Sequence, residues 1–269
     1  MAITAAMVKE LRDKTDAGMM DCKKALTETN GNMEEAIAYL RKHGIAKAEK
    51  RSDRTVKEGR VFSLIEGANG IMIEVCSETD FVASNEKFLA YVKEAAGRIL
   101  AGVKGDGDIT AQAQELEKEN LVNLIAVLGE NIQLRRAVRF EASGTLATYL
   151  HLGGKLGVLL EVEGEIPADL KLLDVCMHIT VYDPLYATSK EIPAERIAKE
   201  KEVLAESEDV KSKPEAIRPK IIDGKIAKWF KEVCLMDQPW FNDEKTTLGK
   251  IAPKMTVKRF VRWKVGQDL

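Results

Sequence analysis

The junction that decides the fold is the stretch SETDFV at residues 77–82, where a strand pattern gives way to a helix pattern. The residues before it, IMIEVC at 71–76, are typical of a mostly buried strand. A serine–asparagine capping pair then precedes a predicted helix over residues 86–100. We therefore expect Asp80 and Phe81 to lie on a short connector whose side chains project outward.

A phenylalanine on such a connector has two explanations. Phe81 either folds back to cover its own sheet, or it is presented to a partner as an aromatic anchor. Large apolar side chains are mostly buried in globular proteins, so the local pattern by itself favours the first explanation. The rest of the chain has to decide between them.

The composition is that of a globular protein with almost no net charge. The 269 residues are 45% hydrophobic, enough for one large core and smaller modules. The 41 basic and 43 acidic side chains give a formal net charge of −2, which argues against an electrostatic grip on nucleic acid. No apolar run approaches the roughly 20 residues that span a bilayer, and the start MAITA lacks a signal-peptide pattern. We expect a cytoplasmic protein with no membrane or nucleic-acid partner.

Nothing in the sequence predicts an enzyme active site or a bound cofactor. The cysteines are far apart and form no CxxC pair, which predicts buried, reduced thiols and no metal site. The three histidines are also scattered, without a triad or cofactor fingerprint. The glycine-rich stretch at 102–108 lacks the GxGxxG and P-loop patterns, so we expect a flexible connector. These observations favour a binding protein that is not an enzyme and binds no nucleotide directly.

Residues 1–54 have the pattern of a small helical module followed by a basic linker. Capping residues predict three helices, over residues 5–14, 21–29 and 33–42. Gly44 lies just past the last of them, and the arrangement resembles ubiquitin-associated three-helix folds. Met19 and Met20 then fall between the first two helices. Methionine is a common gap-filler of small cores, but two adjacent loop methionines cannot easily both point inward, so at least one should be exposed.

After the linker we expect an α+β core built from two related halves with antiparallel sheets. Apolar and β-branched runs predict strands over residues 59–65, 70–75, 131–142, 146–152, 156–163 and 256–265. The turn EGAN at 66–69 favours a hairpin between the first two strands, and a buried helix is predicted over 169–181. The expected divisions are a first subdomain over 55–141 and a second over 142–185 and 229–269.

A charged helical hairpin is predicted between the two parts of the second subdomain, over residues 186–228. Its apolar residues are unevenly spaced, and the segment 209–214 is a natural break between two antiparallel helices. Such a hairpin is usually a solvated projection.

The segment from Arg41 to Arg60 carries eight basic and three acidic side chains. It has two interpretations, a solvated helix end with its linker or an RNA-binding site. No aromatic residue occurs within it, which favours the first.

Several motifs occur in the order and spacing of one known family. They are VKELR at 8–12, TDAGMMDCKKAL at 15–26, TDFV at 79–82, GENI at 129–132, His151 before GVL at 157–159, and Met177-His178 before Pro184. Together these resemble the elongation factor Ts family, the guanine nucleotide exchange factors of elongation factor Tu. In that family's opening, glycine usually stands in place of Asp16.

The resemblance implies a factor that binds GDP-loaded elongation factor Tu and promotes exchange of GDP for GTP. It implies that Asp80 and Phe81, within the loop Thr79 to Val82, enter the G domain and disturb Mg²⁺ and phosphate binding. It also implies that the N-terminal module grips a helix of the G domain, with matching positions at Arg12, Met19, Met20 and Lys23.

Further contacts are implied at Leu128, Gly129, His151 and Phe241. Gly129 is equally suited to terminating a helix, and His151 to being a core histidine. Beside Phe241, Asn242 replaces a residue that is commonly apolar in the family. Some members form dimer contacts through the inserted hairpin, so a homodimer is a further expectation.

Two rival functions use other features of the chain. A ubiquitin-like or peptide-binding adaptor would use Met19 and Met20 but would leave Asp80 and Phe81 without a role. An RNA-binding factor would use the basic segment and lose affinity steeply with salt. Pull-down specificity and the salt dependence of binding separate these functions from nucleotide exchange.

Overall fold

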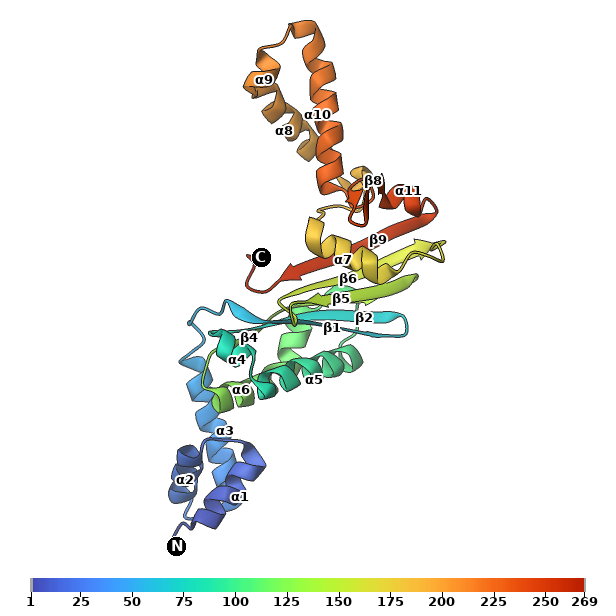
Figure 1. Ribbon diagram of the computed structural model, residues 1–269. Helices are drawn as coiled ribbons and strands as arrows, with labels where there is room; N and C mark the ends of the chain where they lie inside the picture. Colours follow the sequence, from blue (N-terminus) through green and yellow to red (C-terminus); the bar gives the residue numbers. More distant parts are fainter. Residues whose placement is uncertain (1, 269) are drawn as a thin grey trace.

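The structure is a computed structural model that describes residues 2–268, and it has the α+β architecture expected from the sequence (Figure 1). A small helical module forms the N-terminal end, and a helical hairpin projects from the opposite end. Between them, two antiparallel sheets pack on one another, and each carries helices on its outer face. The core is therefore layered as helices, sheet, sheet and helix.

The N-terminal module consists of three helices, α1 (Ala5–Thr15), α2 (Met19–Glu28) and α3 (Met33–Glu49). Thr4 and Asn32 cap α1 and α3 as predicted, because their side-chain oxygens accept hydrogen bonds from free N–H groups of the first turn. Leu11, Ala25 and Leu26 are fully buried in a small core that belongs to this module alone.

Two predicted helix ends in this module were wrong. The helix expected to open at Asp21 begins at Met19, because Gly18 takes the N-cap position and the Asp21 carboxylate is favoured inside the first turn. The third helix continues past Gly44, which is buried against α6 (Thr110–Leu128). A Cβ at Gly44 would lie 3.4 Å from the Ala126 Cβ, so glycine permits this close helix packing, which outweighs its low helix propensity.

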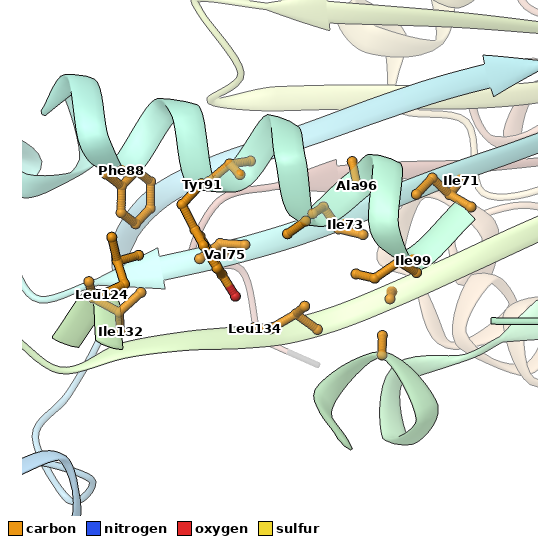
Figure 2. Packing of buried hydrophobic residues seen from close by; sticks show 14 of the residues in the cluster. Ile71, Ile73, Val75, Phe88, Tyr91, Ala96, Ile99, Leu124, Ile132 and Leu134 are labelled. Carbon is orange, nitrogen blue, oxygen red and sulfur yellow. The ribbon is translucent and has the colours of Figure 1, made fainter. Parts of the chain in front are cut away.

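The first half of the core is a four-stranded sheet in the order β1-β2-β4-β3. Its strands are β1 (Glu58–Glu66), β2 (Asn69–Ser77), β3 (Gly107–Asp108) and β4 (Ile132–Glu141). The predicted hairpin is confirmed, with Glu66 paired to Asn69. Figure 2 shows how α5 (Glu86–Gly102) and α6 cover one face, packing Phe88, Ile99 and Leu124 against the strands.

The glycine-rich stretch at 102–108 is in part a strand and not only a connector. Gly107 and Asp108 pair with β4, and the Ile109 N–H then donates to the Ala137 carbonyl at 3.0 Å. The turn into the sheet needs positive φ angles, +113° at Gly105 and +89° at Gly107, that glycine adopts readily.

The second half is a three-stranded sheet in the order β5-β6-β9. Its strands are β5 (Thr145–His151), β6 (Leu156–Gly164) and β9 (Met255–Lys264). Helix α7 (Leu172–Tyr182) covers the outer face, and two short strands, β7 (Pro239–Trp240) and β8 (Asp243–Thr247), and α11 (Leu248–Ile251) complete this half. The inner face packs on the first sheet so closely that a Cβ at Gly157 would lie 2.6 Å from Val61 Cγ1.

The inserted hairpin pairs α8 (Ala194–Glu206) with α10 (Arg218–Val233). The predicted break is occupied by short turns of helix, α9 (Glu208–Lys211) and η2 (Glu215–Ile217), and η1 (Ser189–Glu191) precedes the hairpin. An ion pair of 3.0 Å between Lys201 and Asp223 links the two long helices. The hairpin extends away from both sheets in Figure 1, and its use in a homodimer stays a prediction.

The cysteines behave as predicted. All four are buried and free, and burial raises the pKa of the Cys76 thiol to about 12. Within residues 2–268, no group of histidine, cysteine and carboxylate side chains is arranged to hold a metal ion.

Candidate partner-binding surface

The stretch that decides the fold forms a single turn of helix. After β2 ends at Ser77, α4 (Asp80–Ala83) begins with Thr79 as its N-cap, and the Thr79 hydroxyl accepts a hydrogen bond of 3.3 Å from the Val82 N–H. The expected connector is therefore more ordered than a loop. Ala83 faces inward and is fully buried, whereas the Phe81 side chain is 85% exposed. The explanation that Phe81 covers its own sheet was wrong.

Two glutamates fix this turn to the start of β4. Glu130 accepts from the Thr79 N–H at 3.0 Å and from the Thr79 hydroxyl at 2.6 Å. In the opposite direction, Glu78 accepts from the Asn131 N–H at 2.6 Å. Charge-assisted hydrogen bonds of this length are strong, so the base of the Phe81 turn is held rigidly. The sequence interpretation gave Glu78 and Glu130 no role, although Glu78 is part of the stretch SETDFV and Glu130 is part of the GENI motif.

Asp80 lies beside Phe81 at the first position of α4 and is exposed. A carboxylate is favoured there by the free N–H groups of the helix start. Among the described residues, the Asp80 side chain has no hydrogen-bond or ion-pair partner of its own, so it is free to accept from an incoming group.

A groove of about 560 Å³ collects predicted contact residues from the N-terminal module and from the first half of the core. Arg12 and Met19 of the N-terminal module line one side, and Leu128 at the end of α6 lines the other. The first turn of α5, which follows α4 directly, also contributes to the groove. The packing of α3 on α6 brings these segments together, since 109 positions separate Met19 from Leu128 in the sequence.

The two methionines are both exposed, Met19 by 58% and Met20 by 73%. They occupy the first turn of α2, and Lys23 lies one turn further along the same exposed side. The prediction that at least one methionine is exposed is confirmed. Gly129, just after Leu128, ends α6 with a φ of +80°, so it serves as a helix terminator, and it is exposed as well.

The structure does not bring His151 and Phe241 to this groove. His151 ends β5 in the second half of the core, half-buried, with its Nδ1 3.0 Å from the Tyr149 hydroxyl. Phe241 is half-buried and packs edge-on against Trp240, with ring centroids 4.8 Å apart. Their suggested roles stay predictions for a separate contact region.

Three of the eight basic side chains of the segment from Arg41 to Arg60 form ion pairs within the molecule. Arg54 pairs with Glu78 at 3.3 Å, Lys47 with Asp21 at 2.9 Å, and Arg41 with Glu119. These contacts favour the interpretation as a helix end and linker over an RNA-binding site.

The described part of the chain contains no helix long and apolar enough to cross a membrane.

A comparison with family models matches residues 78–267 to Elongation factor TS. The match covers well over half of the chain and begins next to Thr79, while the N-terminal module lies outside it. The chain therefore belongs to the elongation factor Ts family, the guanine nucleotide exchange factors of elongation factor Tu.

Proposed function

We propose that this chain binds GDP-loaded elongation factor Tu and releases GDP by pressing Phe81 between elements of the G domain, with Asp80 bonding to polar groups beside it. The contact would shift the segments that hold Mg²⁺ and phosphate. The observation that carries the proposal is a phenylalanine 85% exposed on a capped and clamped turn. Because the turn is already held by its cap and by Glu130, its backbone should lose little conformational entropy when it binds.

The mechanism depends on unequal binding to two states of the partner. The factor must bind the nucleotide-free GTPase more tightly than the GDP form, and by linkage GDP must weaken factor binding by the same factor. Equal affinity for both states would release nothing. We assign to Phe81 and Asp80 the contacts that favour the nucleotide-free state. We assign to the groove around Met19 and Leu128 contacts that contribute equally to the affinity for both states.

The function is tested by measuring release of fluorescent GDP from elongation factor Tu in the presence of excess unlabelled GDP. The intact chain should accelerate release in a saturable manner. Absence of any acceleration would reject exchange and would leave the adaptor and RNA-binding functions to be tested by pull-down and by salt titration of RNA binding.

Glu130→Ala should lower the maximal release rate by about threefold to tenfold, because it removes two hydrogen bonds that hold Thr79. The half-saturating concentration should change less, since Glu130 acts through the position of Phe81. Glu115→Ala, on the exposed side of α6, is the matched control and should behave as the intact chain. An unchanged maximal rate in Glu130→Ala would show that the hydrogen bonds from Thr79 to Glu130 are not needed for GDP release.

Met20→Asp should raise the half-saturating concentration by about fivefold to tenfold, because a carboxylate replaces apolar contact area. The maximal rate at saturation should stay within about twofold, as expected when an interaction contributes equally to both states. Met20→Leu keeps the apolar volume and should restore affinity. Since Met20 is 73% exposed, circular dichroism should show the same fold for all three proteins. Equal titration curves for Met20→Asp and the intact chain would exclude this contact.

A further inference from the structure

One ion pair connects the N-terminal module to the core across the groove. Lys87 Nζ of α5 lies 2.7 Å from Asp16 Oδ1, which follows α1. Among residues 2–268, the other ion pair between the module and the core, Arg41 with Glu119, comes from α3 itself. The Asp16–Lys87 pair is thus the one ionic contact that ties the α1–α2 side of the module to the core.

Both residues go against local helix preferences. Asp16 is in the left-handed region, with φ +55°, where glycine is favoured. It also puts a negative charge at the C-terminal end of α1, and Lys87 puts a positive charge in the first turn of α5. The helix dipole disfavours each of these placements. Residues that break local rules and meet one another indicate a selected contact.

The module is joined to the core through α3, which packs on α6 around Gly44. Its buried residues form a cluster separate from the core clusters, and α3 is the element that continues from one to the other. Figure 1 shows the module at the end of α3, beyond α5 and α6. A contact away from the α3 axis, such as Asp16 with Lys87, limits rotation of the module about that axis.

The same two residues line the groove between Met19 and Leu128. We propose that Asp16 and Lys87 form an ionic latch that holds the N-terminal module at the angle at which both walls of this groove contact the GTPase together. This inference rests on the proposed exchange function. Asp16 and Lys87 are positioning residues, since they act through the placement of Met19 and Leu128.

The ion pair should fix the orientation of the module before the partner binds. It should contribute little to the free energy of unfolding. The two side chains are 69% and 49% exposed, and exposed ion pairs contribute little to folding. Fixing the orientation before binding removes part of the ordering penalty that the complex would otherwise carry. Salt screens an exposed pair, so the latch should weaken as ionic strength rises.

The first test uses the GDP-release titration with Lys87→Gln, Asp16→Asn and the exchanged pair Asp16→Lys with Lys87→Asp. Each single variant should raise the half-saturating concentration about threefold to tenfold and leave the maximal rate within about twofold. The exchanged pair should return the half-saturating concentration to within about twofold of the intact chain, because it restores the attraction and places each charge where the helix dipole favours it. Glu10→Gln breaks the equally exposed Lys14–Glu10 pair inside α1 and is the matched control.

The second test does not depend on exchange. Spin labels on cysteines introduced at Glu28 and Gln112, both exposed, report the distance between module and core. The native thiols are buried, and burial raises the pKa of Cys22 and Cys176 among them, so they should remain unlabelled. The distance distribution should be narrow in the intact chain, broad in Lys87→Gln and narrow again in the exchanged pair.

The outcomes separate the latch from the proposed function. If the intact chain releases no GDP, the exchange function fails, and the distance distributions still decide whether the latch exists. Equal distributions in all variants would overturn the latch. A narrow distribution in the exchanged pair without recovered affinity would also overturn it, because Asp16 and Lys87 would then contact the partner directly.

Discussion

Phe81→Ala is expected to lower the maximal rate of GDP release from elongation factor Tu by about 10- to 100-fold. Burying a phenylalanine side chain stabilises a complex by about 1.5–3 kcal/mol, which corresponds to a factor of this size. The loss should appear in the maximal rate, because the contact is assigned to the nucleotide-free state and not to both states. Initial binding of the GDP form, which we assign to the groove around Met19 and Leu128, should weaken only slightly.

The fold should not contribute to this result. Phe81 is 85% exposed and Ala83 supplies the buried side of the turn, so the unfolding midpoint should match that of the intact chain. Val203→Ala on the helical hairpin is the matched control, since Val203 is 59% exposed and remote from α4. If Phe81→Ala accelerates GDP release as much as the intact chain does at saturation, the exchange function stands. The proposal that Phe81 presses between elements of the G domain is then wrong.

Local chemistry explains which elements could be predicted from the sequence. Thr4 and Asn32 were recognised as helix caps because their hydrogen bonds join residues two or three positions apart. The end of α3 could not be predicted in this way. It depends on Gly44 packing against Ala126, which is 82 positions away in the sequence.

The local pattern alone did not favour the exposure of Phe81, for the same reason. The local pattern showed an aromatic residue after a buried strand, which is more often part of a core. What decides its exposure is the inward direction of Ala83 and the contact of Thr79 with Glu130, which lies 51 positions away. The resemblance to the family supplied the exposed interpretation that the local pattern did not favour.

The groove required similar long-range information. The resemblance implied Arg12, Met19 and Leu128 as individual contact residues and did not place them together. The packing of α3 on α6 brings them to one surface. His151 and Phe241 were named with them and lie in the second half of the core, His151 at the end of β5 and Phe241 between β7 and β8. A factor that contacts its partner through both regions needs its two halves held at a fixed angle.

A buried carboxylate connects these halves. Glu74 on β2 is fully buried, and it accepts from Arg136 Nε at 2.5 Å and from the Gly266 N–H at 2.8 Å. Arg135 completes the charge cluster at 3.5 Å from Glu74. Since Gly266 follows β9 of the second sheet, the carboxylate links β2 and β4 of the first sheet to the end of the second. The Arg136 guanidinium also lies over the Trp263 ring, 4.4 Å from its centroid.

Glu74→Ala is therefore expected to reduce the free energy of unfolding by about 3–5 kcal/mol, because it leaves two largely buried guanidinium groups without their counter-charge. Urea unfolding followed by tryptophan fluorescence measures this change, and Trp263 beside Arg136 should report it directly. Glu165→Ala breaks an ion pair of similar length, 2.8 Å to Lys254, in which both side chains are at least 70% exposed. Its midpoint should stay close to that of the intact chain, since solvent already screens that pair. If the two variants unfold at the same urea concentration, the buried Glu74 network does not stabilise the contact between the two halves of the core.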